Sequence, residues 1–452
     1  MLGKDKVRRI TDESIEYGLA SGATQVEASV TCNKSYLTRY AMNHINHNTG
    51  CENSRFTARV VLGKRTGSAS IGSLDPVRVK AAVDQAITLA RLADPDPNFK
   101  GLPVSEPVSW EGSWSKDTKD LSPDGRAGIV SEIVGEARRN RLEAAGIIAN
   151  EEEELAVKNS LGLDSYQKGT SYAFTVTSMS ATGSGYARSD GWDIKNLDWR
   201  ELAEPTMEKA LSSQNPVSVE PGVYEVILES NASAVLFNFF TRLALSGRAY
   251  LDGRSLVSGR LGEKFVSEKL DIFDDGLDLR GVPRAFDSEG MPKKRLELVS
   301  KGHVVNVCYD SYTAGLREGL ESTGHEASFR SYKQDPFPAN VFVEPGTSTV
   351  EDMISSTKRG LWITRFHYTN PIDPYHIVVT GMTRDAMFLI EDGKVVAPVR
   401  PMRFTQNVVE ALSGIQALGG EIQYIGGYIG GPKVGQAVPA VKIDRFNFTG
   451  RV

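Results

Sequence analysis

One apolar helix, set in a half of the chain made mostly of short strands, constrains the fold more than any other feature. Over residues 231–247, apolar side chains recur at helical spacing and cover a wide side of the helix. Asn231 is predicted to cap its start, because a short polar side chain can accept the free backbone N–H groups there, and Gly247 is predicted to end it. A helix this apolar is expected to be buried, so the following strands must pack around it.

The first half of the chain has a different pattern. The ranges 24–31, 35–40, 56–62 and 66–71 read as strands, most of them alternating apolar and polar residues. Asp75-Pro76 and Ser122-Pro123 are helix-start signals, each followed by an apolar stripe. Short strands are predicted over 146–185, with a turn at 151–154. These patterns predict an α+β fold with two or more helices on a mainly antiparallel sheet.

Residues 212–222, SSQNPVSVEPG, are the best linker candidate, since their Pro, Ser and Gly residues interrupt both periods. We predict an N-terminal α+β domain over 1–215 and a C-terminal β-rich domain over 216–452 that carries the buried helix. A chain of 452 residues is long enough for two domains. With 40% hydrophobic and 24% charged residues, it can bury a large core without disulfide or metal staples.

The charge, hydropathy and cysteines of the chain indicate its cellular compartment and the partners that it can bind. The net charge of −5 argues against nucleic-acid binding, which needs a concentrated basic face. No signal sequence is recognised and no apolar run approaches the ~20 residues that span a bilayer, so we expect a cytoplasmic protein without membrane contact. Cys32, Cys51 and Cys308 form no C-x-x-C pair, which suits a reducing compartment, and each is expected to be a buried free thiol.

Two histidines form an H-x-x-H pair in the Asn-rich stretch NHINHN, at His44 and His47. A metal pair would need a third ligand nearby, and none is evident. A solvated loop is therefore the favoured interpretation of this stretch.

Ordered motifs in the second half resemble the TldD/PmbA (TldD/TldE) metallopeptidase family. They include SGRLGEKFVSEKLDIFDDG at 258–276, DSEGMP at 287–292 and IEDGKVVAPV at 390–399. The zinc-bearing subunit of that family carries His-Glu-x-x-x-His on a helix. In the alignment, Asn238 and Leu243 stand at the two histidine positions and Phe239 stands at the glutamate position. Its third ligand, a cysteine in C-G-K-x-G-Q, falls on Gly431 of GPKVGQ.

These replacements leave no good zinc donor and no general base at the aligned positions. The resemblance therefore implies a metal-free chain of TldE/PmbA type, with no cofactor of its own. Such a chain would dimerise with a zinc-bearing TldD-type homologue, or with itself, and help to form a cavity for unfolded peptides. Whether it is itself an enzyme stays open. The alternative is a homo-oligomeric binding protein, or an enzyme with a different, non-zinc activity.

Three residues are candidates for peptide binding. His325 lies in 315–332, which resembles a family loop near the substrate cleft of the zinc-bearing subunit, although packing of a glycine loop is an equal alternative. Arg365 and His367 would share one face of a strand with Thr369, giving a polar face for a peptide chain or a carboxylate. A solvated sheet face is the competing interpretation for that strand.

Overall fold

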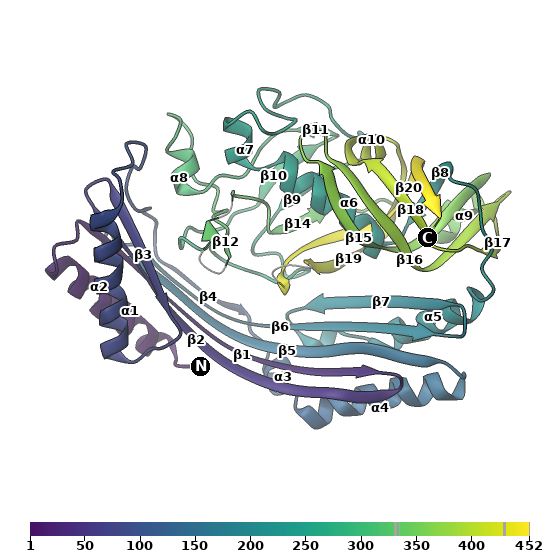
Figure 1. Cartoon of the computed structure of the whole chain (residues 1–452), viewed down its shortest axis with the longest axis horizontal. Coiled ribbons are helices and arrows are strands. Elements are labelled where there is room, and N and C mark those ends of the chain that lie inside the picture. The colour runs from purple at the N-terminus through teal and green to yellow at the C-terminus, as the bar shows by residue number, and fades with distance from the viewer. Residues whose placement is uncertain (330–331, 334, 428–430, 452) are drawn as a thin grey trace.

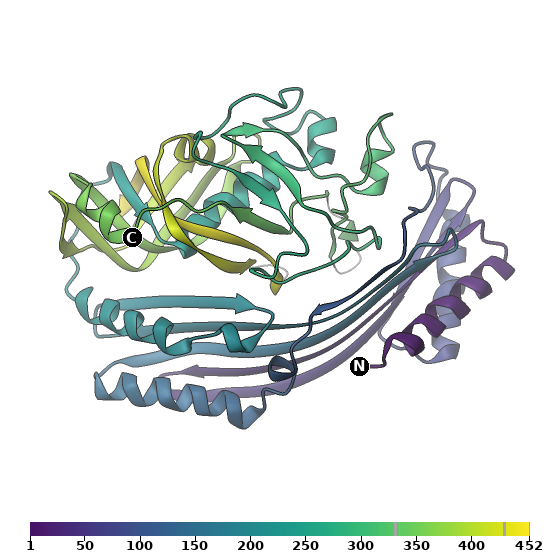
Figure 2. The same ribbon diagram turned by 180° about the vertical axis from the view of Figure 1, so that it is seen from behind.

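The computed structural model of the chain describes residues 1–329, 332–333, 335–427 and 431–451. The first half forms a long curved sheet, and the second half forms a β-rich unit that sits on its concave side (Figure 1 and Figure 2). The predicted α+β class is confirmed. Among the helices of the described residues, none has the length and apolar character that crossing a bilayer requires.

The first sheet has the strand order β3-β2-β1-β5-β6-β4, with β7 pairing on β6. Neighbouring strands are antiparallel, except that β4 runs parallel to β6. The strands are β1 (Gln25–Ala41), β2 (His44–Leu62), β3 (Arg65–Ile71), β4 (Val108–Ser113), β5 (Glu143–Asn159), β6 (Asp164–Met179) and β7 (Ser184–Gly191). The helices are α1 (Lys4–Ala20), α2 (Pro76–Leu92), α3 (Lys116–Lys119), α4 (Pro123–Arg139) and α5 (Trp199–Ser212), with a 3-10 turn at Ile194–Asn196.

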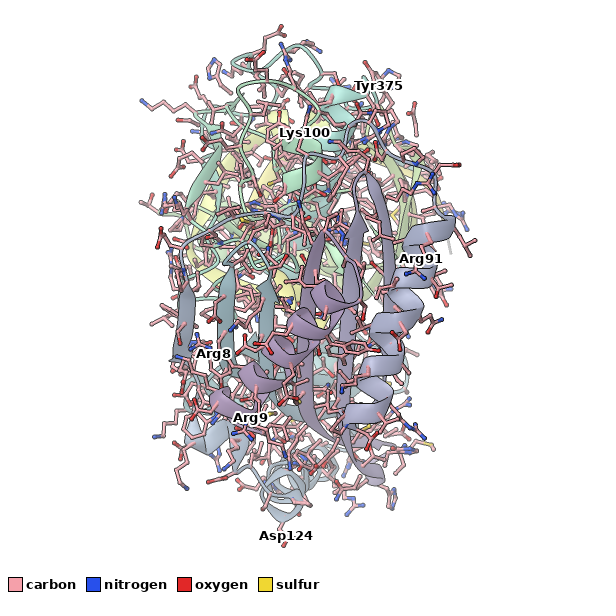
Figure 3. The ribbon with its side chains drawn as sticks, turned by 90° about the vertical axis from the view of Figure 1, so that its left-hand side faces the viewer. Arg8, Arg9, Arg91, Lys100, Asp124 and Tyr375 are labelled. Carbon is pink, nitrogen blue, oxygen red and sulfur yellow. The ribbon has the colours of Figure 1, made fainter. Side chains whose placement is uncertain are left out.

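Helices cover the convex face of this sheet at both ends. At one end α1 and α2 pack on β1 and β2, and the view along the sheet shows them outside it, with the second half above (Figure 3). At the other end α4 and α5 pack on β5 and β6. The start of α2 is as predicted, since Pro76 is its first residue and the Asp75 carboxylate accepts from the backbone N–H of Val77 at 3.1 Å.

The strands are longer than predicted. β1 is one strand where two were predicted, and β5 runs without a break through 151–154. The predicted turn was wrong because buried partners keep these acidic residues in the sheet. Glu154 is fully buried, and its carboxylate accepts from the Tyr166 hydroxyl and the Leu2 N–H, each at 2.8 Å.

The Asn-rich stretch belongs to strand β2 and is not a loop, although it is exposed as a loop would be. Neither face of β2 is covered from His44 to Asn53, a range that includes Cys51. The prediction of a buried thiol was therefore wrong for Cys51, which is exposed, and right for Cys32 and Cys308.

The second sheet has the order β11-β10-β9-β14-β20-β18-β16-β15-β8, and β20 also pairs with β8, so five strands close on themselves. Its strands are β8 (Gly222–Leu228), β9 (Ile272–Asp274), β10 (Leu296–Ser300), β11 (His303–Val304), β14 (Asn340–Val343), β15 (Arg359–Asp373), β16 (Val378–Glu391), β17 (Lys394–Pro398), β18 (Met402–Asn407), β19 (Ile415–Gly427) and β20 (Gly431–Arg451). A two-stranded hairpin of β12 (Ser328–Phe329) and β13 (Tyr332–Lys333) lies outside it. The helices are α6 (Ser230–Ala244), α7 (Gly247–Leu251), α8 (Ser311–Ala314), α9 (Val350–Ser355) and α10 (Val408–Ser413).

The predicted apolar helix is α6, and it is buried as predicted. Leu236, Phe237 and Phe240 are fully buried in the largest apolar cluster, together with residues of β8, β15 and β20. Two details of the prediction were wrong. Glu229 precedes the first turn, so Asn231 lies inside the helix, and Gly247 begins α7 after α6 has ended at residue 244.

The two halves share a buried interface. Residues 213–221 join α5 to β8, and the predicted boundary between 215 and 216 falls within them. The loop 276–293 packs on β5 and β6, where Phe286 is buried in one apolar cluster with Leu155 and Val157. The side-chain amide of Gln167 donates to Pro283 O at 3.2 Å and accepts from Ala285 N at 2.8 Å. This contact fixes the space between the halves.

Candidate functional site

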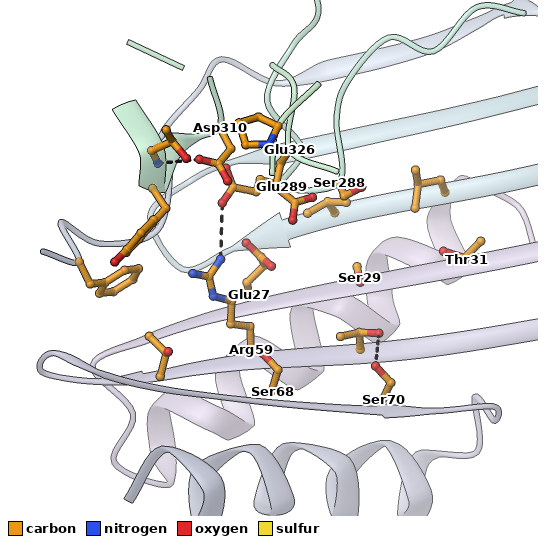
Figure 4. A pocket seen from close by; sticks show the side chains of 18 of the residues that line it. Glu27, Ser29, Thr31, Arg59, Ser68, Ser70, Ser288, Glu289, Asp310 and Glu326 are labelled. Carbon is orange, nitrogen blue, oxygen red and sulfur yellow. Dashed lines mark hydrogen bonds and ion pairs between the residues drawn. The ribbon is translucent and has the colours of Figure 1, made fainter. Parts of the chain in front are cut away.

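A cavity of about 830 Å³ lies between the two halves of the chain (Figure 4). Its floor is the concave face of β1, β2 and β3. Its roof comes from the second half, namely the loop 284–289, α8 and residues near 326 and 335. The site is therefore built jointly by segments that are far apart in the sequence.

Strand register arranges the floor in rows. Glu27, Arg59 and Ser68 stand side by side across β1, β2 and β3. The next row consists of Ser29, Thr57 and Ser70, and the hydroxyls of the last two are 2.8 Å apart. Because a hydroxyl can both donate and accept, this surface can pair with the N–H and with the C=O of a bound amide.

Arg59 links the floor to the roof. Its Nη1 lies 3.6 Å from the Glu289 carboxylate, which is 4% exposed. Burial alone would lower the pKa of Arg59, but three neighbouring carboxylates outweigh this effect and raise it, those of Glu27, Glu289 and Glu326. The inner part of the cavity thus has one guanidinium among several acidic groups.

Asp287 shapes the loop that carries Glu289. Its buried carboxylate accepts from the backbone N–H groups of Glu289 and Met291, each at 3.0 Å, and of Glu326 at 2.8 Å. Burial and the nearby charge of Glu289 raise the pKa of Asp287, and the N–H donors oppose this rise only in part. One side chain thereby ties together the two loops that place Glu289 and Glu326 over the floor.

A second buried carboxylate, Asp274, sits behind the roof. It accepts from His325 Nε2 at 3.0 Å, from Lys293 Nζ at 3.3 Å and from the N–H groups of Ala339 and Asn340, both at 2.7 Å. Burial alone would raise the pKa of Asp274, but Lys293 and His325 hold that pKa well below its usual range. Asp274 therefore joins β9 to the segments before and after the hairpin β12–β13.

His325 is the other end of this network. Its ring is buried, and Nδ1 lies 2.9 Å from the Thr323 hydroxyl. Burial and the positive charge of Lys293 lower the pKa of His325, against the opposing effect of Asp274. The neutral ring that this favours donates from Nε2 to Asp274 and accepts at Nδ1. His325 does not line the cavity, whereas the next residue, Glu326, does.

Arg365 and His367 lie away from the cavity, on the side of β15 that faces the first sheet. Arg365 forms an ion pair with Asp385, and its guanidinium lies 3.7 Å from the ring centre of Tyr186 on β7. His367 Nε2 is 2.6 Å from Arg384 Nη1. The structure does not bring these two residues together with His325.

The positions aligned with the family's zinc site lie on α6 and β20. Asn238, Phe239 and Leu243 are half-buried, and the last two pack against the main apolar cluster. One turn after Asn238, the Arg242 guanidinium lies 4.2 Å from the ring centre of Phe337. Phe337 directly follows residues 335 and 336, which line the cavity. Gly431 begins β20 opposite Gly427, and residues 428–430 between them lie outside the described ones.

No group of three or more His, Cys, Asp or Glu side chains in the described residues is arranged to hold a metal ion. Catalytic zinc takes three such ligands at about 2.0–2.3 Å and keeps one position open. An amide, a phenyl ring and an isobutyl group on α6 do not fit that requirement. Glu289, which lines the cavity, is instead engaged with Arg59 and with the backbone N–H of Ser311.

Comparison with known proteins defines the class of this chain. Residues 221–450 match the family model for the PmbA/TldA metallopeptidase C-terminal domain, which covers half of the chain. The chain therefore belongs to the TldD/PmbA metallopeptidase family.

Individual relatives agree with this assignment. The metalloprotease PmbA of Escherichia coli is 24% identical over 450 residues, which is 92% of each chain. A metalloprotease of Methanothermobacter thermautotrophicus is 25% identical over 278 residues, so this chain spans 60% of its length. The crystal structure of TldE from Thermococcus kodakarensis has the same fold, with a TM-score of 0.88 and 24% identity over 98% of this chain and 100% of that one.

The residues that line the cavity differ from the predicted site residues. A signal for the floor was present, because Glu27, Ser29 and Thr31 alternate with the buried residues of β1, and Arg55, Thr57 and Arg59 do the same on β2. No comparable pattern marks the roof, which is made of loops.

Proposed function

We propose that this chain is the metal-free subunit of a two-chain, TldD/TldE-type cytoplasmic peptidase, in which it holds unfolded peptide while a zinc-bearing homologue cleaves it. The observation that carries the proposal is the surface of α6, which presents Asn238 and packs Phe239 and Leu243 on the core. A metal-activated water needs ligands and a neighbouring base, and these residues supply neither. Similarity over 92% of a protein named as a metalloprotease supports the peptide chemistry.

The cavity supports the substrate class. An unfolded peptide exposes one N–H and one C=O per residue, and the hydroxyls of Ser29, Thr57 and Ser70 can pair with both. Such contacts do not depend on side-chain identity. Arg59 and the surrounding carboxylates add charges of both signs, which suits the termini or charged side chains of a peptide.

The decisive experiment combines this chain with a zinc-bearing homologue that carries His-Glu-x-x-x-His. The pair should co-purify as a 1:1 complex and cleave an unstructured peptide, and a chelator should abolish the cleavage. This chain alone should contain less than stoichiometric zinc after dialysis and show no chelator-sensitive cleavage. One tightly held zinc per chain would overturn the proposal, and so would failure to bind the homologue.

The alternative is a homo-oligomer with a non-zinc activity of its own. The charges of both signs in the cavity favour this function, because acidic and basic side chains can act without a metal. Peptide turnover by this chain alone that persists in chelator would establish the alternative.

A further inference from the structure

Arg242, on α6, has a guanidinium group without an acceptor. The residue is half-buried, and the guanidinium lies over the ring of Phe337, 4.2 Å from the ring centre. In the part of the chain that the structure describes, the Arg242 side chain forms neither a hydrogen bond nor an ion pair. A guanidinium is a donor of several N–H groups, and a charge that leaves water is normally paired. The missing partner therefore needs an explanation.

Other arginines that lie over an aromatic ring differ from Arg242 in this respect. Those that approach a ring about as closely each form an ion pair with a carboxylate, namely Arg200, Arg260, Arg295 and Arg365. The two interactions are compatible, because contact with a ring through the face of the guanidinium leaves N–H groups at its edge free to donate. A carboxylate is thus a common partner of a stacked arginine in this molecule.

Arg126 shows how a buried guanidinium is held by neutral acceptors instead. It is 1% exposed, and burial lowers its pKa, as burial lowers the pKa of Arg242. The Arg126 guanidinium donates to the Thr38 hydroxyl at 3.0 Å, and to Leu121 O and Asn150 Oδ1, each at 2.8 Å. Arg242 has a similar cost of burial without such acceptors.

The guanidinium of Arg242 is still accessible, and it lies next to the cavity. Its nitrogen atoms are not among the side-chain atoms that the fold encloses completely. Asp335 and Pro336 line the cavity, and Phe337 follows them directly, so Arg242 lies just beyond this part of the rim. The carboxylate of Asp335 pairs with Arg254, at 2.8 Å, and not with Arg242. The position beside Arg242 is therefore available to a ligand.

Asn238 adds further donors at the same place. It precedes Arg242 by one turn of α6, and side chains four residues apart are neighbours on a helix surface. Its side-chain amide is half-buried and forms no hydrogen bond with the described residues. A carboxylate accepts at both of its oxygens, and an amide N–H can donate to one while a guanidinium donates to the other. The two side chains can therefore share one carboxylate.

We propose that Arg242 and Asn238 bind a carboxylate of the peptide that the cavity holds. The inference rests on the proposed function, and it gives the peptide a point of recognition beyond the hydroxyls of the floor. The carboxylate belongs to the C-terminus of the peptide or to an Asp or Glu side chain, because both present the same planar pair of oxygens to a guanidinium. Its negative charge supplies the counter-ion that Arg242 lacks.

The test measures the binding of peptides to this chain alone, because zinc in a partner would itself bind carboxylates. One pair of peptides shares an unstructured sequence without Asp or Glu and ends in a free carboxylate or in an amide. A second pair ends in an amide and carries Glu or Gln at its centre. With a fluorophore at the N-terminus, anisotropy should show about tenfold tighter binding of the carboxylate-bearing member of at least one pair. The pair that shows the difference identifies the source of the carboxylate.

Substitutions locate the effect. Arg242→Gln should abolish the difference within the pair, and Asn238→Ala should reduce it about threefold. Arg242→Lys keeps the charge without the planar fork and should retain only part of the difference. Arg260→Gln is the matched control, because Arg260 also lies over a ring, 4.6 Å from the centre of Phe265, but is paired with Glu263 at 2.8 Å. This control should keep the full difference.

The outcomes separate this inference from the proposed function. If the wild type binds both members of both pairs equally, the carboxylate site is wrong while the holding of peptide stands. A difference that survives Arg242→Gln, or that Arg260→Gln also abolishes, would likewise contradict the site. If Arg242→Gln does not fold, an unchanged difference in Arg242→Lys counts against the site in the same way. Failure of the wild type to bind any of these peptides would overturn the proposed function and this inference together.

Discussion

The floor of the cavity is fixed by strand register, whereas its roof is fixed by buried carboxylates. On the floor, the backbone ladder between neighbouring strands sets the spacing of Arg59, Thr57 and Ser70. In the roof, Asp274 and Asp287 gather backbone N–H groups from loops that are distant in sequence. A lost side chain should therefore cost little structure in the floor and much more in the roof.

This difference bears on function. A floor that tolerates changes in its side chains can be adjusted for ligands, because the sheet persists beneath it. A roof that depends on single carboxylates must keep them in order to hold any shape. If the two walls differ in this way, substitutions in the roof should cost more stability than substitutions in the floor.

Removing the Asp274 carboxylate should have the largest effect. Asp274→Ala leaves the Lys293 ammonium buried without a counter-ion and leaves two backbone N–H groups without an acceptor. Breaking a buried pair in this way costs about 3–5 kcal/mol of unfolding free energy. Urea titration followed by circular dichroism measures it.

The adjacent Asp275 is the matched control. It is half-buried, and its carboxylate accepts from Leu277 N at 2.9 Å. Asp275→Ala should cost about 1 kcal/mol. Equal losses from the two variants would show that Asp274 does not hold the roof.

Loss of Arg59 should have an intermediate effect, since this residue joins the two walls. Arg59→Gln removes the positive charge from among the surrounding carboxylates, and we expect a loss of about 2 kcal/mol. Arg55→Gln is the control, because Arg55 lies on the same face of β2 but is exposed, and it should change stability by less than about 0.5 kcal/mol. A loss no greater for Arg59→Gln would mean that the walls are not coupled through this residue.

The buried ring of His325 should give the roof a pH dependence that the floor lacks. Its pKa is lowered on folding, so between that value and the ordinary value of about 6.5 only the unfolded chain binds the proton. The stabilisation is complete above about pH 6.5 and is lost as the pH falls through this window, by up to about 1.4 kcal/mol per pH unit.

The measurement compares wild type with His325→Gln in urea titrations between pH 5 and 7.5. The other histidines are common to both proteins, so the difference in unfolding free energy should widen as the pH rises toward 6.5. Parallel curves would indicate that the ring titrates alike in the folded and unfolded chain.

Much of the fold could be predicted from the sequence, because local periodicity marks many of its helices and strands. The stripe of α6 and the Asp75-Pro76 start of α2 are encoded by residues within a few positions of one another, and both elements are present. The failures involve distant partners. No local signal could show that Glu154 would be buried against Tyr166 and the N-terminal residues, so a strand was mistaken for a turn.

The candidate site also has parts that local sequence patterns indicate and parts that depend on distant partners. The α6 positions stay a prediction that rests on an aligned motif, whereas the floor of the cavity follows from alternation once the strands are assigned. The roof could not be predicted, because Asp274 and Asp287 accept from backbone N–H groups as far as 66 and 39 residues away, respectively. His325 was selected for its loop, yet its neighbour Glu326 is the residue that reaches the cavity.

The smallest structural effect, and the sharpest test of the floor, is expected from Thr57→Val. Valine keeps the shape and strand preference of threonine and loses only the hydroxyl that faces Ser70, so stability should change by less than about 0.5 kcal/mol. Affinity for an unstructured fluorescent peptide should nevertheless fall roughly threefold to tenfold, the equivalent of one hydrogen bond. Thr49→Val is the control, since Thr49 lies on the same face of β2 outside the cavity and its loss should leave affinity unchanged. Equal affinities for the two variants would mean that peptides do not bind on the floor, even if the roof proves as dependent on Asp274 as we expect.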